Sequence, residues 1–389
     1  MTQDDTPLRR CAALLFMPQE TSELDLPALL AGGEAITRRQ RLLALAAHRD
    51  EPLEVDPADV AALARLSPES AVPRAALSML DDAALARLLS AGLVVRADDP
   101  APPDAAVRDA HWEPLAAVAH RHTRWRGVRT PDTQPDSQAR SLRALVQRLG
   151  PPPEASPQRG DSSGRIALPR ALDTAASALL GRRATCRNFD RARPLPLAHA
   201  ATLLHGVFGA QAAVAVDGGA EVLKKLSPSG GGLHPTEAYM LAIDVEGIAP
   251  GIWHYRARDH ALDPLRVLPR EDLRSFALLA LAGQDWFADA PLMVVHACRF
   301  PRTFWKYRQH AKAWRAAVLD VGHLSQTAYL LATELGLGAF VTAAINEGDL
   351  EAALGLDPLL EGPLAMSGFG WRTAQRLHPE FDPLGATRA

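Results

Sequence analysis

Cysteine is scarce in this sequence. The three cysteines, Cys11, Cys186 and Cys298, are odd in number and far apart, which excludes a disulfide framework and a Cys-x-x-Cys metal site. Thiols that stay reduced are typical of cytoplasmic proteins. The chain also lacks the basic-then-apolar start of a signal peptide, and no apolar run approaches the roughly 20 residues of a membrane helix. We therefore expect a cytoplasmic protein without a membrane span.

A large net charge is missing as well. The 42 basic and 45 acidic residues leave a formal net charge of −3, so no global field draws the chain to nucleic acid or to an anionic membrane. Hydrophobic residues make up 47% of the chain, enough for large cores. At roughly 150 residues per domain, 389 residues predict two or three domains. Proline-rich sequence near the middle predicts a linker at 129–168, between an N-terminal domain at 1–128 and a second domain at 169–389.

The N-terminal region begins with a strand pattern and continues with helix signals. The apolar segment Arg10 to Met17 predicts a strand, and the leucines and alanines from Glu34 to His48 have helical spacing. Asp56 followed by Pro57 is typical of an N-cap with proline at the first helical position. We therefore expect one strand and then two helices in this region.

A third helix signal starts at Asp81, where carboxylates suit the helix dipole, and Gly92 is placed as its stop. Leu93 to Val95 then predicts a strand. Three helices followed by a strand is a winged-helix order. The helix that would read DNA carries two aspartates and only Arg87, too little positive charge to hold phosphates. A peptide-holding or purely structural domain is favoured over a DNA-binding one.

Three histidines, His111, His120 and His122, follow this region. A His-x-His pair is able to bind metal, but no cysteine or carboxylate except Glu113 lies nearby at ligand spacing. We interpret them as surface or core histidines and expect no metal site.

The second half contains a possible anion cradle. In an extended segment alternate residues face the same way, so Arg183, Thr185 and Arg187 would present two guanidinium groups and a hydroxyl together. Guanidinium groups match the oxyanions of a phosphate monoester. A solvated basic patch is the alternative interpretation.

A glycine-rich loop follows about forty residues later. Pro228 and Pro235 stiffen its ends, and the three glycines between them are able to take positive φ and approach a flat or anionic ligand closely. Ser229 adds a hydroxyl group. The apolar run from Glu237 to Asp244 predicts a buried strand after the loop. On its own, the segment is equally compatible with a plain turn before a strand.

Taken together, these segments resemble the FMN-binding signature of the nitroreductase fold, and more closely its SagB-type dehydrogenase branch. That branch oxidises azoline rings in ribosomally made peptides. The similarity runs from Ala171 to Arg372 and includes the segments Pro250–Tyr255 and Phe304–Arg308. It implies an α+β nitroreductase-like FMN domain preceded by a winged-helix-like domain, and a homodimer with the long helix Trp314–Leu335 in its core.

The resemblance also implies residue roles. Arg183, Thr185 and Arg187 would hold the FMN phosphate and ribityl end, and Lys306 and Tyr307 would supply the base that removes a substrate proton. The loop residues expected along the isoalloxazine ring are Pro228, Ser229, Gly230, Gly231 and Gly232.

The expected function is therefore an FMN-dependent, two-electron oxidation of a precursor peptide, either azoline to azole or a related dehydrogenation. The sequence after Tyr307, Gln309 to Trp314, departs from the branch's usual pattern and leaves the azoline substrate open. A cyclodehydratase is a further expected partner. The alternatives are an NAD(P)H-dependent nitro or quinone reductase and a flavin-free scaffold that presents a peptide.

Overall fold

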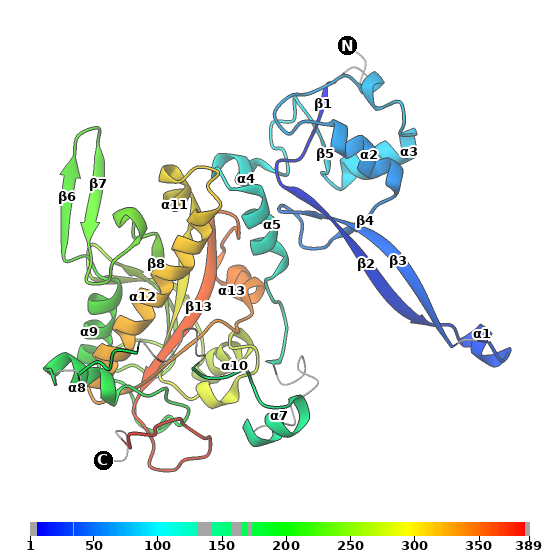
Figure 1. The fold of residues 1–389 in the computed structure, drawn as a ribbon. Coiled ribbons are helices and arrows are strands. Elements are labelled where there is room, and N and C mark those ends of the chain that lie inside the picture. Colours follow the sequence, from blue (N-terminus) through cyan, green and yellow to red (C-terminus); the bar gives the residue numbers. More distant parts are fainter. Residues whose placement is uncertain (1–5, 34, 131–141, 157–164, 170–172, 386–389) are drawn as a thin grey trace. The chain divides into compact units, whose positions relative to one another are not determined.

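The computed structural model describes residues 6–33, 35–130, 142–156, 165–169 and 173–385. The chain forms two compact units (Figure 1). Unit 1 comprises Met1–Arg124, Cys298–Val318 and Gly355–Gly362, and unit 2 comprises the remainder. The domain division expected from the sequence stays a prediction.

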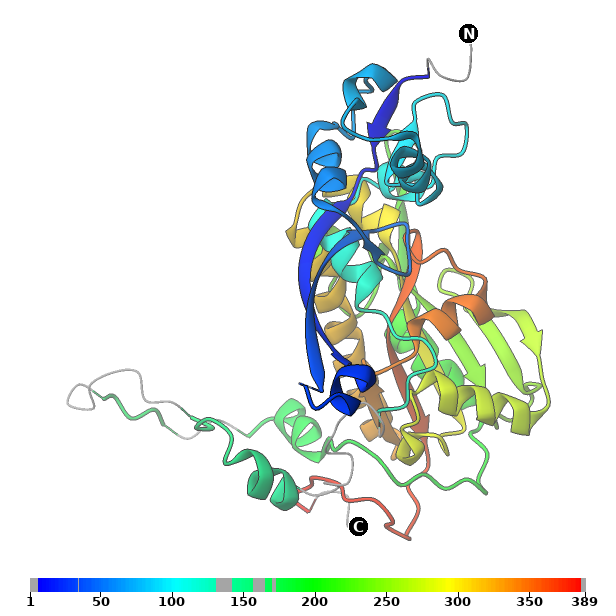
Figure 2. The same ribbon diagram turned by 90° about the vertical axis from the view of Figure 1, so that its right-hand side faces the viewer.

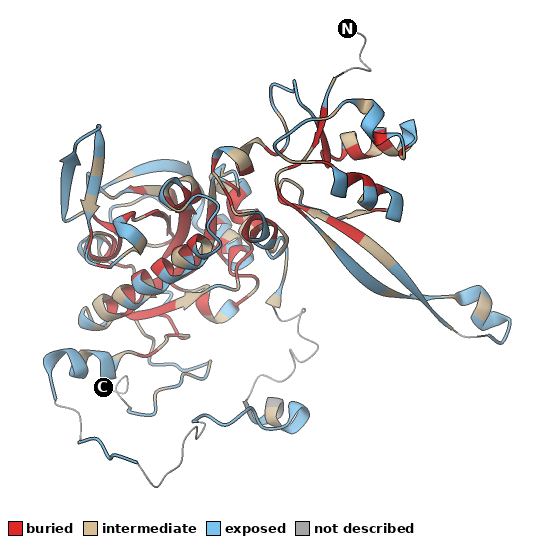
Figure 3. Cartoon of the chain, turned by 45° about the horizontal axis from the view of Figure 1, so that its top comes forward, coloured by how far each residue is buried: buried red, intermediate tan, exposed pale blue. Residues whose placement is uncertain are grey.

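Unit 1 contains a long ribbon of two strands that carries a short helix at its tip (Figures 1 and 2). Strand β2 pairs antiparallel with β3 along its whole length, from Leu14 opposite Ala46 to Leu24 opposite Ile36. The outer half of the ribbon is exposed (Figure 3). The elements of this region are β1 Leu8–Arg10, β2 Leu14–Leu24, α1 Leu26–Leu30, β3 Ile36–Ala46, β4 Leu53–Glu54, α2 Pro57–Arg65, α3 Asp82–Ser90 and β5 Val94–Arg96.

The helix predicted before α2 is a strand in the structure, β3. The spacing of apolar residues predicts a helix over Glu34–His48, but Ile36–Ala46 is a strand, and residue 34 lies outside the described residues. Leucine, alanine and arginine favour a helix locally. Cross-strand pairing over the eleven residues of β3 overrides that preference. The strand expected from Arg10 to Met17 is likewise two strands, because the chain leaves β1 at Arg10 and re-enters pairing at Leu14.

Local helix signals are confirmed. Helix α2 begins at Pro57 with Asp56 in a capping box, and the Asp81 side chain accepts a hydrogen bond at the start of α3. Gly92 follows α3 with φ +69°, the left-handed conformation expected of a glycine stop. The structure therefore has two of the three expected helices and the following strand, and the winged-helix assignment is not confirmed.

An aromatic cluster joins the later segments of unit 1. The indole of Trp112 packs against Phe300 and Phe304, with ring centroids 4.7 and 4.5 Å away, and its Nε1 donates to Leu359 O at 2.8 Å. His120 stacks on Trp112 at 5.4 Å, which confirms its interpretation as a core histidine. The elements concerned are α4 Ala105–Asp109, α5 Pro114–His122 and α11 Phe300–Lys306.

Unit 2 is built on a six-stranded sheet with the order β10-β9-β8-β11-β13-β12. Helices α9 and α12 cover one face and share a core with it, in which Leu203, Met240, Val294, Ala328 and Phe369 are buried (Figure 3). The strands are β8 Thr236–Ala242, β9 Gly251–Arg256, β10 Ala261–Val267, β11 Leu292–Arg299, β12 Gly338–Thr342 and β13 Glu361–Gly370. The mixed helix and sheet fold expected from the sequence is confirmed.

Unit 2 contains further helices and a hairpin. They are α7 Leu142–Leu149, α8 Ala175–Arg182, α9 Leu197–Phe208, α10 Arg270–Ala280, α12 Lys312–Glu334, α13 Glu347–Leu354 and the hairpin of β6 Ala212–Val216 with β7 Ala220–Lys224. Within the described part of the chain, no helix combines the length and the apolar content needed to cross a membrane.

Helix α12 matches the long helix expected at Trp314–Leu335, and Gly336 follows it with φ +72°. It is not buried all round in the single chain. Leu319 has 63% of its surface exposed, and Gly322, His323 and Gln326 are exposed on the same side. Residues three and four positions apart lie on one helix face, so these positions form a continuous exposed stripe.

Candidate functional site

The segment that carries the predicted anion cradle is extended. Cys186 N donates to Ala339 O at 2.8 Å, and Thr185 bridges to the same residue of β12. Burial alternates along the segment, with Ala184, Cys186 and Asn188 buried and the residues between them half-buried. Successive side chains of an extended chain point to opposite sides. The half-buried residues Arg183, Thr185 and Arg187 therefore share one side, as the spacing predicts.

Tyr329 of α12 contacts this side of the segment. Its hydroxyl lies 3.1 Å from Thr185 Oγ1 and accepts a hydrogen bond from Val341 N at 3.1 Å. The guanidinium of Arg183 lies over the Tyr329 ring, 5.4 Å from the centroid. An aromatic face attracts a guanidinium, so Tyr329 fixes the position of both cradle residues. Sequence reasoning did not identify Tyr329, which is 144 residues from Thr185.

Arg187 is hydrogen-bonded to two residues near the C-terminus, Pro379 and Glu380. Its backbone N–H donates to Glu380 Oε1 at 2.6 Å, and its Nη1 donates to Pro379 O at 3.2 Å. The neighbouring Cys186 is not a nucleophile at neutral pH, because burial raises the pKa of its thiol to about 12.

The glycine loop has the backbone that its composition predicts. Gly231 and Gly232 have φ values of +65° and +70°, and both are exposed together with Pro228. A Cβ built on Gly232 would meet no atom of the chain within 4 Å. The loop thus leaves open space beside a backbone conformation that favours glycine.

Asp320 of α12 anchors the loop. Its carboxylate accepts hydrogen bonds from Ser229 Oγ at 2.5 Å and from Gly230 N at 2.9 Å. Ser229 Oγ in turn accepts from His234 N at 2.9 Å. Only 5% of Asp320 is exposed. The Ser229 hydroxyl, which the resemblance places along the flavin ring, donates to Asp320, and its role toward a ligand stays a prediction. Sequence reasoning missed this anchor, for which an aspartate inside an apolar helix was the available signal.

The cradle and the loop contact different sides of α12. Tyr329 lies nine residues after Asp320. At about 100° per residue, these two positions are roughly half a turn apart around the helix. The exposed stripe through Leu319 and Gly322 lies between them on the outer side. One chain therefore places the two halves of the predicted cofactor site on opposite flanks of α12.

The predicted base pair lies in unit 1, whereas the cradle and loop lie in unit 2. Lys306 ends α11 and is exposed, Tyr307 is the C-cap of the same helix, and Lys306 Nζ is 5.5 Å from the Tyr307 ring centroid. The buried rings of Phe300 and Phe304 hold α11 against Trp112. The Lys306 ammonium and Tyr307 phenol are therefore side by side at the end of a firmly packed helix.

Two of the three histidines singled out in the sequence, His120 and His122, have partners for their side chains in the structure. His120 Nε2 lies 2.8 Å from Pro358 O, and His122 Nε2 lies 3.1 Å from Ala46 O. His111 takes a positive φ of 57°. Among the described residues, no group of three or more His, Cys, Asp or Glu side chains is arranged to hold a metal ion.

Comparison with known proteins identifies the second half of the chain. Residues 180–371 match the model of the nitroreductase family. The trifolitoxin-processing protein TfxB of Rhizobium leguminosarum bv. trifolii is 34% identical over 150 residues, which are 38% of this chain and 39% of TfxB. The microcin B17-processing protein McbC of Escherichia coli is 26% identical over 147 residues, 37% of this chain and 53% of McbC. The chain thus spans well under two thirds of either processing protein.

A third relative is matched over most of its own length. The Methanocaldococcus jannaschii protein MJ1384, named as a nitroreductase, is 33% identical over 142 residues, which are 36% of this chain and 69% of MJ1384. The matched family model contains the cradle, the glycine loop and the two α12 residues that position them. With this match over residues 180–371 and this relative, the chain belongs to the nitroreductase family.

Proposed function

We propose that this chain is an FMN-dependent dehydrogenase that matures a ribosomally made peptide. The reaction is a two-electron oxidation, of thiazoline or oxazoline to the azole or a related dehydrogenation. Membership of the nitroreductase family supports an oxidoreductase, and proteins of this family generally bind a flavin. Two relatives are named as processing proteins for trifolitoxin and microcin B17, which supports a peptide substrate.

The observation that carries the cofactor proposal is the fit of the two site halves to FMN. Arg183, Thr185 and Arg187 present two guanidinium groups and a hydroxyl on one side of an extended segment, a donor set that suits a phosphate monoester. Gly231 and Gly232 have the positive φ and the open surroundings that a flat ring needs to approach the backbone. A bound FMN would supply the two-electron chemistry.

A homodimer would complete this site. The cradle and the loop lie on opposite flanks of α12, and the stripe between them is exposed and includes Leu319. A second copy packed on this stripe about a two-fold axis would cover the stripe and bring its own loop to the first copy's cradle. Each cofactor would then be held by Arg183 of one copy and Gly232 of the other.

Lys306 and Tyr307 are proposed to handle the substrate proton. Oxidation of an azoline removes a proton from one carbon and a hydride from its neighbour. A side chain that accepts the proton lowers the barrier to that step. The Lys306 ammonium lies beside the Tyr307 ring, so the lysine charge would stabilise a phenolate if the tyrosine gives up its proton. The precursor peptide and a cyclodehydratase are the proposed partners, in the cytoplasm.

Replacement of Gly232 by alanine tests the cofactor proposal. Gly336 provides a matched control, because it has nearly the same φ and its Cβ would also meet no atom within 4 Å. Both substitutions should cost about 1–2 kcal/mol of stability from the left-handed backbone. Of the two added methyl groups, only that of Gly232→Ala should project into the space assigned to the flavin. We expect weaker FMN binding by flavin fluorescence for Gly232→Ala and wild-type binding for Gly336→Ala.

The same variant tests the shared site. Co-expression of Gly232→Ala with Arg183→Ala should yield mixed dimers that contain one intact site and one doubly altered site, and these should bind one FMN per dimer. Mixed dimers without FMN would contradict the two-copy arrangement. Equal FMN binding by wild type and Gly232→Ala would contradict the loop assignment.

The reaction is tested on a candidate precursor peptide by mass spectrometry, where each processed site should lose two hydrogens. A flavin that NAD(P)H reduces rapidly in the absence of peptide would favour the nitro or quinone reductase alternative. A purified protein that stays colourless after FMN is added would favour the scaffold alternative and contradict the proposal.

A further inference from the structure

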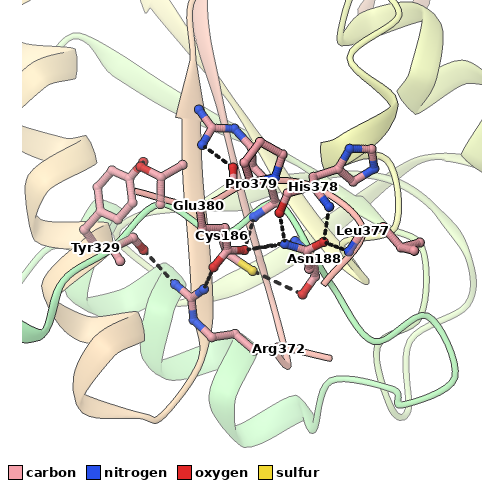
Figure 4. A network of polar contacts seen from close by, with 11 residues as sticks. Cys186, Asn188, Tyr329, Arg372, Leu377, His378, Pro379 and Glu380 are labelled. Atoms are coloured by element: carbon pink, nitrogen blue, oxygen red, sulfur yellow. Dashed lines mark hydrogen bonds and ion pairs between the residues drawn. The ribbon is translucent and has the colours of Figure 1, made fainter. Parts of the chain in front are cut away.

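The chain returns near its C-terminus to line the segment that carries the cradle. After β13, Thr373 N donates to Asn188 O at 3.1 Å, and the Asn188 side chain accepts from the N–H groups of Leu377 and His378, both at 2.8 Å. Asn188 Nδ2 also donates to His378 O at 2.8 Å (Figure 4). Residues 372–380 are thereby hydrogen-bonded to the cradle segment; we call them the C-terminal strap.

Glu380 is the polar centre of the strap. Only 3% of its side chain is exposed. Its Oε1 accepts from Arg187 N at 2.6 Å, Asn188 N at 3.2 Å and Asn188 Nδ2 at 3.0 Å, and its Oε2 pairs with Arg372 Nη1 at 2.5 Å. Every donor in this set is part of the cradle segment or of the strap. Burying a carboxylate is costly unless such donors compensate it.

Arg372 connects the same hydrogen-bond network to Ala184, the residue before Thr185 in the chain. Its Nη2 donates to Ala184 O at 2.7 Å, while its Nη1 pairs with Glu380. The backbone is therefore held at Ala184 through Arg372 and at residues 187–188 through Glu380. Because Arg372 pairs with the Glu380 carboxylate, neither Arg183 nor Arg187 is needed to compensate the charge of Glu380.

We propose that Glu380 is a positioning residue for the phosphate cradle, acting through the backbone of Arg187 and the side chain of Arg372. This inference rests on the proposed binding of FMN. A phosphate-binding segment whose backbone is already ordered binds more tightly, because less conformational entropy is lost on binding. The C-terminal strap orders the backbone at residues 187–188, which follow the last hydrogen bond of the segment to β12, at Cys186. Glu380 does not touch the phosphate itself.

FMN and riboflavin distinguish this role from a general structural one, because the two ligands differ only in the phosphate. The dissociation constants of both are measured by fluorescence quenching for wild type, Glu380→Ala and Glu380→Gln. Glutamine keeps one oxygen for the backbone donors and loses the charge opposite Arg372. Phe381→Ala is the control, since Phe381 is adjacent and 85% exposed. Thermal melting of each variant checks folding.

We expect FMN affinity to fall by about tenfold or more in Glu380→Ala, the equivalent of one lost charge-assisted hydrogen bond, and by less in Glu380→Gln. Riboflavin affinity should stay unchanged in both variants, and Phe381→Ala should bind both ligands normally. Equal losses for the two ligands would mean a structural role only. Stronger FMN binding would mean that the carboxylate opposes the phosphate. Either result overturns the proposal.

The outcome also separates this proposal from the proposed function. If wild type binds neither ligand, the FMN assignment itself fails, and Glu380 positions no phosphate cradle. If wild type prefers FMN over riboflavin and the Glu380 variants keep that preference, the flavin assignment stands and the positioning role alone is wrong.

Discussion

Replacing Asp320 by alanine should release the glycine loop from α12. Asp320 is 5% exposed, and its carboxylate accepts two hydrogen bonds, from Ser229 Oγ and from Gly230 N. Alanine leaves both donors without this acceptor, at the start of the turn that contains Gly231 and Gly232. The loop would then sample conformations other than the one that binds a ligand.

The magnitude follows from the two contacts. A hydrogen bond to a charged group contributes about 1.5–3 kcal/mol, so the two bonds amount to about 3–6 kcal/mol. In Asp320→Asn, the amide oxygen can still accept from Gly230 N while its NH₂ donates to Ser229 Oγ. That variant loses only the charge assistance, about 1 kcal/mol for each bond.

Ligand affinity and melting temperature together test this reasoning. A ligand that binds only the ordered loop binds more weakly in proportion to the lost population. We expect the FMN dissociation constant to rise about 10- to 100-fold in Asp320→Ala, or about 1.4–2.8 kcal/mol, with the rest of the loss appearing as a lower melting temperature. Asp320→Asn should be intermediate. Glu334→Ala, at an exposed position of the same helix, should resemble wild type. An Asp320→Ala variant that binds FMN and melts like wild type would refute the anchor.

Two further predictions concern the proposed catalytic base and the stability of the protein at low pH. Lys306→Ala and Tyr307→Phe should lose peptide turnover and keep flavin, as measured by mass spectrometry of the peptide and by absorbance; normal turnover in both would refute the assigned base. Burial lowers the pKa of His120 and of His296 to about 3. Below about pH 6.5 the unfolded chain therefore binds protons at these histidines that the folded chain does not bind. Each histidine should lower the free energy of unfolding by about 1.4 kcal/mol for every pH unit below that value. Melting temperatures at pH 7.5 and 5 should therefore differ less in His120→Gln and His296→Gln than in wild type, and an undiminished difference would contradict this assignment.

Local rules predicted the features that depend on neighbouring residues. The caps at Asp56 and Asp81 and the stop at Gly92 are in place, because a cap is satisfied by backbone groups two or three residues away. The alternation of burial around Thr185 follows from the two-residue period of an extended chain. Positive φ at Gly231 is permitted by the lack of a Cβ.

Pairing with distant residues determined the secondary structure where local composition predicted the wrong type. Ile36–Ala46 has the composition of a helix, yet its antiparallel partner β2 makes it a strand. Leu319 of α12 is exposed in the single chain, so the burial expected of this helix within a dimer stays a prediction. Spacing along a helix indicates which residues share a face, but not which surface covers that face.

By itself, the sequence determined the nitroreductase membership, through several motifs that follow in order along the chain. It also determined the cradle spacing from Arg183 to Arg187 and the glycine composition of the loop, because these are properties of adjacent residues. Only the tertiary structure decided that Asp320, Tyr329 and Glu380 hold those segments. These three contacts bridge 91, 144 and 193 positions along the chain. Their side chains reach the site only after packing of the sheet, α12 and the C-terminal strap has brought distant residues together, and no local pattern encodes that approach.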